Sequence, residues 1–264
     1  MGDRAPGRLS GSPAAGAWVA TGPLGAPAIV FVHGTLLTRA QWSPQLRLLS
    51  ERYRCIAVDL PGHGTLAAVP FTREGAADSV ADAIAAECPD GRAVVVGLSL
   101  GGYVAIDTAH RHPERVAGLV LAGCSAEPRG PVALPFRMLA WVLAHAPRGL
   151  VDAVGRTWFR VRYPPRTADP VIEDGFWPRG GAGALRAVAG TPYLERLALL
   201  WTPVLLVNGA LDLVFAPGGE AWAQSCRSGS HVVLGRAVHQ APMDRPRTFS
   251  TLVARFVEGV RQTG

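Results

Sequence analysis

The sequence predicts an α/β fold, in which a doubly wound and mostly parallel sheet carries a helical cap insertion. Five short apolar runs are rich in Val, Ile, Leu and Ala and do not alternate with polar residues, which is typical of strands buried on both faces. Helical patterns lie between the runs, and this alternation favours a parallel sheet. A length of 264 residues suits one large domain, or one domain with an insertion.

The expected strands follow from these apolar runs, and a last strand is expected near the carboxyl end. In chain order the predicted strands are Ala28–His33, Cys55–Leu60, Ala93–Leu98, Val116–Ala122, Val204–Val207 and His231–Leu234. The first ten residues are rich in Gly, Arg, Pro and Ser and are expected to form a frayed end.

Four helices are expected around the sheet. Apolar positions at helical spacing predict a helix over Trp42–Arg52, and Thr72 is a plausible N-cap for a helix that reaches Cys88. The helix Gly101–His112 should stop before the following proline. Pro246–Val260 places its apolar residues on one face and predicts the last helix.

One stretch, residues 126–196, breaks this alternation. It contains no clear buried strand, but many prolines and glycines and a high density of aromatic side chains. We therefore expect a core in two parts, residues 1–125 and 197–264, with a helical cap or lid of residues 126–196 between them. A cap over the carboxyl edge of a sheet covers something, so its aromatic side chains are candidates to line a substrate pocket: Trp141, Trp158 and Phe159.

Composition excludes several classes of protein. The net charge is +6, but all 26 basic residues are arginines dispersed along the chain, without the basic stripe and aromatics of a nucleic-acid binder. No apolar run reaches the roughly 20 residues of a membrane helix, and no secretory signal is evident. Four scattered cysteines form no metal or redox motif. We expect a cytoplasmic monomer or homodimer that needs no metal or cofactor and binds neither nucleic acid nor membrane.

The sharpest motif is a candidate nucleophile turn. The sequence Gly97-Leu98-Ser99-Leu100-Gly101-Gly102 follows a predicted strand and opens a predicted helix, which is the setting that G-x-S-x-G requires. Glycines on either side of the serine allow a sharp, strained turn that side chains would block. The turn would lift the Ser99 hydroxyl clear of the sheet edge, so the motif indicates nucleophilic catalysis.

Together with three other segments, this turn resembles the α/β-hydrolase family. Val32-His33-Gly34-Thr35 is similar to the family's HG motif, and Asp59-Leu60-Pro61-Gly62-His63-Gly64 to its D-x-P-G-x-G loop. Gly235-Arg236-Ala237-Val238-His239-Gln240-Ala241-Pro242 resembles the family's histidine loop. The order and spacing match over nearly the whole chain. The resemblance implies structural roles for His33 and His63.

A serine hydroxyl becomes a strong nucleophile when a base accepts its proton, and the base needs an acidic side chain that fixes its tautomer. His239 follows the last predicted strand and suits the order Ser, Asp, His. The family places the acid after the strand before the last, where Asp212 is the carboxylate in the loop. Some members carry it after an earlier strand, which makes Glu127 the alternative.

The resemblance also implies an oxyanion hole of two backbone N–H groups. One would come from Leu100, the residue after the nucleophile, and the other from Thr35 in the HG loop, with Leu36 as second choice. Leu36 is also a candidate substrate-binding residue.

The residue at position 99 selects the reaction. A serine excludes the aspartate chemistry of related epoxide hydrolases and dehalogenases. We therefore expect a carboxylesterase that cleaves small to medium apolar esters through an acyl-enzyme. Alternatives on the same fold are a lactonase, a thioesterase, a carbon–carbon bond hydrolase or a perhydrolase. A ligand-binding receptor is the non-enzyme alternative, against which an intact Ser99, Asp212 and His239 argue.

Overall fold

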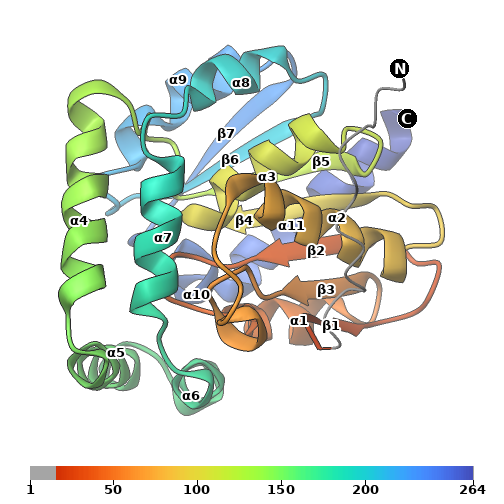
Figure 1. Ribbon diagram of the computed structural model, residues 1–264. Coiled ribbons are helices and arrows are strands. Elements are labelled where there is room, and N and C mark those ends of the chain that lie inside the picture. The colour runs from red at the N-terminus through yellow and green to blue at the C-terminus, as the bar shows by residue number, and fades with distance from the viewer. Residues whose placement is uncertain (1–15, 264) are drawn as a thin grey trace, which may run out of the picture.

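A seven-stranded sheet forms the centre of the molecule (Figure 1). The computed structural model describes residues 16–263, so the expected frayed end lies outside the described residues. The strand order is β1-β3-β2-β4-β5-β6-β7, and every neighbouring pair is parallel except β1 with β3. The strands are β1 (Trp18–Thr21), β2 (Ala28–Val32), β3 (Arg54–Val58), β4 (Ala93–Leu98), β5 (Val116–Ala122), β6 (Val204–Gly209) and β7 (Gly229–Leu234). The predicted doubly wound, mostly parallel sheet is confirmed.

Strand β1 was not among the predicted strands. Its four residues alternate between half-buried and exposed positions, and it pairs antiparallel with β3 at the edge of the sheet. An edge strand with one solvated face lacks the continuous apolar run that marks β2 to β6. The sequence therefore gives a weaker signal for β1.

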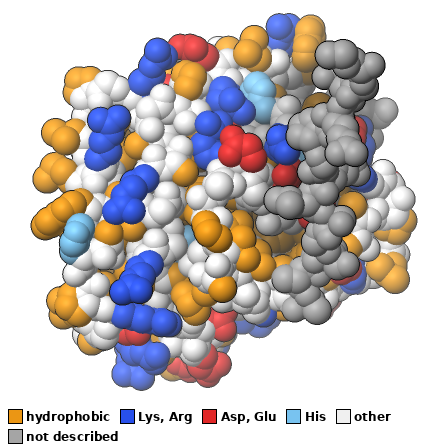
Figure 2. All heavy atoms as spheres, viewed as in Figure 1, with side chains coloured by type: hydrophobic (Ala, Val, Ile, Leu, Met, Phe, Trp, Pro, Cys, Tyr) orange, Lys and Arg blue, Asp and Glu red, His pale blue; other side chains and the backbone are white. Residues whose placement is uncertain are grey.

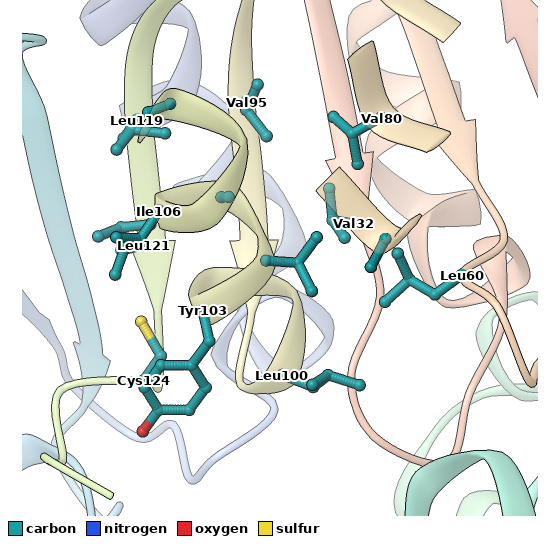
Figure 3. Close-up of a cluster of buried hydrophobic side chains, with 14 of the residues drawn as sticks. Val32, Leu60, Val80, Val95, Leu100, Tyr103, Ile106, Leu119, Leu121 and Cys124 are labelled. Atoms are coloured by element: carbon teal, nitrogen blue, oxygen red, sulfur yellow. The ribbon is translucent and has the colours of Figure 1, made fainter. Parts of the chain in front are cut away.

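Helices cover both faces of the sheet. On one face, α2 (Arg73–Glu87), α3 (Leu100–Arg111) and α9 (Gly219–Ser225) bury their apolar side chains against the strands. Figure 3 shows Tyr103 and Ile106 of α3 beside Leu119 and Leu121 of β5 in this cluster. On the other face, α1 (Ser43–Leu49), α10 (Ala241–Asp244) and α11 (Pro246–Thr263) pack around Trp42 and Phe249. The predicted N-cap is present, because the Thr72 hydroxyl accepts a hydrogen bond from Gly75 N at 3.0 Å.

The segment between β5 and β6 is helical. It contains α4 (Ala133–His145), α5 (Arg148–Arg162), α6 (Pro165–Asp174), α7 (Pro178–Val188) and α8 (Tyr193–Leu199). Figure 1 shows α4 to α7 grouped at one end of the molecule, beside the arrowheads of β2 and β3. Helix α8 instead packs on α3 and α9. Within residues 16–263, no helix is both long enough and apolar enough to cross a membrane.

Four short helical turns complete the described chain. They are η1 (Arg39–Trp42), η2 (Gly64–Leu66), η3 (Gly130–Val132) and η4 (Ala216–Gly218). The first two belong to the loops that follow β2 and β3, and η4 belongs to the loop after β6. Because parallel strands end at the same edge of the sheet, these loops meet there and carry the candidate site.

Candidate active site

Ser99 has a strained backbone between β4 and α3. Its φ is 54° and its ψ is −116°, a conformation that costs about 1–3 kcal/mol in a residue other than glycine. Arg236 is the other non-glycine residue with positive φ in the described chain. In this conformation Ser99 is the N-cap residue of α3, and Leu100 is the first helical residue.

Glycines make this turn possible. A Cβ atom at Gly97 would lie 2.2 Å from the Gly101 carbonyl oxygen, and one at Gly101 would lie 2.1 Å from the Val32 carbonyl oxygen. Both contacts are far shorter than van der Waals distance. The G-x-S-x-G pattern is thus a steric requirement for packing the start of α3 against β2 and β4.

Asp212 and His239 are joined by a hydrogen bond of 2.9 Å from Nδ1 to Oδ2. Asp212 lies in the loop after β6 with only 3% of its side chain exposed, whereas the His239 side chain is 35% exposed. Burial by itself raises the pKa of Asp212, but the hydrogen bond and charge of His239 and the amides of Phe215 and Val214 together lower it. The carboxylate is therefore held ionised, and it directs the other imidazole nitrogen, Nε2, away from itself.

His239 lies against the end of β5, next to the Ser99 turn. A Cβ atom at Gly123 would be 3.1 Å from both Nδ1 and Cε1 of the imidazole. Gly123 follows Ala122, whose carbonyl accepts a hydrogen bond from Ser99 N at 2.8 Å. In the described chain no hydrogen bond joins the Ser99 hydroxyl to His239, and such contacts often tighten only when substrate is bound.

Phe215 completes the setting of the histidine. Its ring stacks on the imidazole with centroids 4.9 Å apart and an interplanar angle of 24°. Its backbone N also donates to Asp212 Oδ1 at 3.2 Å. Sequence reasoning did not select Phe215, although an aromatic residue three positions after the acid was the available signal.

The loop after β2 carries Thr35 and Leu36. Gly34 N donates to the Gln41 side-chain oxygen at 2.9 Å, and Gln41 Nε2 donates to Gln240 Oε1 at 2.7 Å. Gln41 is fully buried. This pair of amides connects the Thr35 loop to the residue that follows His239. No feature of the sequence pointed to it, because the two glutamines are 199 positions apart.

His33 and His63 are buried and bind backbone groups. His33 Nε2 accepts from Leu60 N at 3.0 Å, so Nδ1 is the nitrogen that donates to Gly34 O. Burial, and then the nearby His63, hold the pKa of His33 well below its usual value. His63 Nε2 lies 2.6 Å from Thr35 O, and burial lowers its pKa in spite of that contact. Both side chains hold the loops that surround Ser99, in agreement with the structural roles expected.

Helix α7 begins directly on the Thr35 loop. Trp177 N donates to Leu36 O at 3.0 Å. A Cβ atom at Gly181 would lie 2.6 Å from Thr35 O, and one at Gly180 would lie 2.0 Å from Gly62 O. The backbone of α7 therefore touches both loops, and only glycine permits this approach.

The candidate substrate-binding residues occupy different environments. Leu36 packs against two apolar clusters, and Phe159 is 3% exposed in one of them, together with Leu37 and Met243. Trp141 is 62% exposed and packs on His145 instead. Trp158 is 42% exposed. The structure thus brings Leu36 and Phe159 to one cluster beside the site loops, and it leaves both tryptophans largely at the surface.

Glu127, the alternative acid, lies elsewhere. Its Oε2 accepts a hydrogen bond from Leu194 N at 3.0 Å, at the start of α8. Burial raises its pKa. His239 bonds to Asp212, so the geometry favours Asp212 as the acid.

Comparison with known proteins identifies the family. A model described as "Alpha/beta hydrolase family" matches residues 29–252. The chain belongs to the alpha/beta hydrolase family. This confirms the resemblance found in the sequence motifs.

Several relatives of the chain are named as esterases or lactonases. The chain is 42% identical over 256 residues to a pimeloyl-[acyl-carrier protein] methyl ester esterase of Aromatoleum aromaticum, a match that covers 88% of this chain and 99% of the relative. It is 26% identical to 3-oxoadipate enol-lactonase 1 of Acinetobacter baylyi, over 91% and 92% of the two chains. A thermophilic esterase from Thermogutta terrifontis superposes with a TM-score of 0.78 at 28% identity, over 92% and 93% of the chains. These relatives support the expected carboxylic ester hydrolase.

Proposed function

We propose that the protein hydrolyses carboxylic esters with Ser99 as nucleophile, His239 as base and Asp212 as acid. The observation that carries the proposal is the 2.9 Å bond from Asp212 to His239 Nδ1, beside a serine held in a strained turn. Asp212 fixes the tautomer in which Nε2 is free to accept a proton.

In this mechanism the Ser99 oxygen bonds to the ester carbonyl carbon while its proton passes to His239 Nε2. The carbonyl oxygen becomes an oxyanion, which the backbone N–H groups of Leu100 and Thr35 stabilise. When the bond to the alcohol breaks, the alcohol takes the proton from Nε2. Water then repeats the two steps, releases the acid and restores Ser99.

The substrate's apolar part would lie against the cluster of Leu37, Phe159 and Met243. This cluster reaches both site loops, because Leu37 follows Thr35 by two residues and Met243 follows His239 by four. Helices α4 to α7 would then act as the cap. This arrangement supports esters with an apolar acyl or alcohol group.

The Aromatoleum relative is named for a methyl ester on an acyl-carrier protein, and we extend this substrate class to the present chain. Three arginines of α4 and α5 have no carboxylate partner among residues 16–263, namely Arg137, Arg156 and Arg160. Hydrophobic side chains are exposed beside them on the same helices, among them Leu134, Met138, Trp141, Val154 and Val161. Figure 2 shows such blue and orange side chains along the α4 end of the molecule. Exposed apolar side chains that gather beside unpaired positive charge favour an interaction surface, and we assign these helices to binding of the carrier protein.

The decisive experiment combines labelling with turnover. A fluorophosphonate should label Ser99, and the enzyme should cleave p-nitrophenyl acetate. Ser99→Ala should abolish labelling and lower kcat by up to about 10⁶-fold. Labelling at another serine, or an active Ser99→Ala variant, would overturn the assignment. A panel of free methyl ester, carrier-bound methyl ester, thioester and enol lactone then ranks the substrates, and the proposal requires the carrier-bound methyl ester to show the highest kcat/KM.

A further inference from the structure

A cleft lies between α1, the junction of α5 and α6, and the start of α11, and its lining includes none of Ser99, Asp212 and His239. Its volume is about 320 Å³. Four arginines line it, Arg47, Arg162, Arg166 and Arg247, and Asp244 is the single carboxylate in its lining. Four positive charges and one negative charge leave this small space with a net charge of +3.

Asp244 does not neutralise the remaining arginines. Its side chain is 1% exposed. Oδ1 accepts from Arg162 at 2.8 Å and from the Tyr163 hydroxyl at 3.0 Å, and Oδ2 accepts from Val238 N at 2.8 Å. Burial, and then the nearby Asp244, raise the pKa of Tyr163, so this hydroxyl stays a neutral donor. Both oxygens of the Asp244 carboxylate are thus hydrogen-bonded to groups other than Arg47, Arg166 and Arg247.

The other three arginines have no carboxylate partner within the described chain. All three are exposed. Arg47 Nη2 donates to the backbone oxygen of Arg166 at 3.1 Å, which holds the Arg47 guanidinium at the start of α6. Arg166 and Arg247 form no ion pair among residues 16–263. Like charges gathered in this way repel one another, and a multivalent anion would remove that repulsion.

We propose that this cleft binds a phosphate group, carried either by an organic molecule or by inorganic pyrophosphate. Guanidinium groups bind phosphate through paired N–H donors. Arg47, Arg166 and Arg247 all have donors that Asp244 does not use, because Asp244 is already bound by Arg162, Tyr163 and Val238. The apolar side chains of Leu48 and Pro164 in the same lining give room for the organic part of a phosphate ester. Asp244, in the lining of this cleft, accepts a hydrogen bond from Val238 N, and Val238 directly precedes His239.

The test is calorimetric titration of the purified full-length protein with sodium pyrophosphate at fixed ionic strength. The parent should bind one equivalent saturably. The double variant Arg166→Gln with Arg247→Gln should bind at least tenfold more weakly. The matched control is Arg255→Gln with Arg261→Gln, which removes the same charge from exposed positions further along α11 and should bind within twofold of the parent.

Titration with adenosine 5′-diphosphate and with adenosine distinguishes the two sources of phosphate. Tighter binding of the diphosphate than of pyrophosphate, with no binding of adenosine, indicates an organic phosphate, and equal binding indicates the inorganic anion. The proposal is wrong if the parent binds neither phosphate compound, or if both double variants lose affinity equally. Binding is measured without turnover, so this result is independent of the ester hydrolysis proposed above.

Discussion

The two oxygens of Asp212 have different partners. Oδ2 accepts from His239, while Oδ1 accepts from the backbone of Val214 and Phe215. An asparagine would keep the size of the side chain but would favour the wrong imidazole tautomer, at a cost of about 10⁴ in kcat in serine proteases. We expect Asp212→Asn to fold and to lose most of its kcat.

Glu127→Gln is the matched control for this change. Glu127 binds the backbone at α8, and its variant should stay within about threefold of the parent kcat, which is less than 1 kcal/mol. Steady-state kinetics on one p-nitrophenyl ester gives kcat for both variants. If Glu127→Gln lost most of its kcat and Asp212→Asn did not, the catalytic acid would be Glu127, after the earlier strand.

The lowered pKa of Asp212 also predicts how stability depends on pH. A carboxyl whose folded pKa lies below its usual value of 3.8 binds protons more weakly in the folded than in the unfolded chain. Its stabilisation is therefore complete above that value and is lost as the pH falls through the folded pKa. Urea unfolding should show a larger difference between the parent and Asp212→Asn at pH 5 than at pH 3. A difference that grows in acid would contradict this assignment.

At the scale of elements, the start of α7 packs against the loop that contains Thr35. Gly181→Ala would place a methyl group 2.6 Å from Thr35 O and 2.9 Å from Thr35 Cγ2. The helix or the loop must shift, which would displace the oxyanion donor that we propose at Thr35. Removing such a donor completely costs about 10²–10³ in kcat. We expect Gly181→Ala to lower kcat at least tenfold while KM changes less.

Gly183→Ala lies two positions further along α7 and tests the steric argument. Its new Cβ would meet only Phe71 Cβ at 3.8 Å, an ordinary contact. Alanine in a helix is favoured over glycine by roughly 1 kcal/mol, so this variant should melt at a slightly higher temperature and keep its kcat. Equal losses of activity in both variants would show that α7 does not position the Thr35 loop.

Elements with a strong local signal were the predictable ones. Strand β4 and the start of α3 follow from an apolar run and the glycines around Ser99, and both are found where expected. The helices between β5 and β6 could not be bounded from the sequence. Helix α6 contains an internal proline, Pro170, and α5 buries only Phe159, so the usual breaks and apolar faces are weak guides there.

Within the site, the sequence indicates residues but not how distant segments pair. Ser99, Asp212 and His239 each follow a recognisable strand, and a hydrogen bond joins the last two. The bond between Gln41 and Gln240, and the contact of Gly181 with Thr35, arise only from tertiary packing. The same applies to the exposed positions of Trp141 and Trp158, because an aromatic residue in a sequence does not show which face of a helix will be covered.

At the scale of the whole molecule, one buried ion cluster ties helix α8 to helices α2 and α3. Asp107 of α3 is 4% exposed. It accepts two hydrogen bonds from Arg73 of α2, at 2.6 and 2.9 Å, and one from the Tyr193 hydroxyl of α8 at 3.0 Å. Arg196 of α8 lies 3.1 Å away. Three helices therefore depend on one carboxylate.

Removing the charge of Asp107 should lower the free energy of unfolding but leave kcat unchanged. In Asp107→Asn, Arg73 and Arg196 would lose their carboxylate in a largely buried setting, and breaking such a pair costs about 3–5 kcal/mol. Asp78→Asn is the control, because Asp78 of α2 pairs with Arg111 and is 40% exposed. Exposed pairs contribute roughly 0–1 kcal/mol. Urea unfolding should therefore separate the two variants by at least about 2 kcal/mol, while kcat per folded molecule stays near that of the parent in both. If Asp107→Asn were as stable as Asp78→Asn, α8 would be held by apolar packing alone. A fall in kcat at full stability would instead mean that this cluster acts on the site.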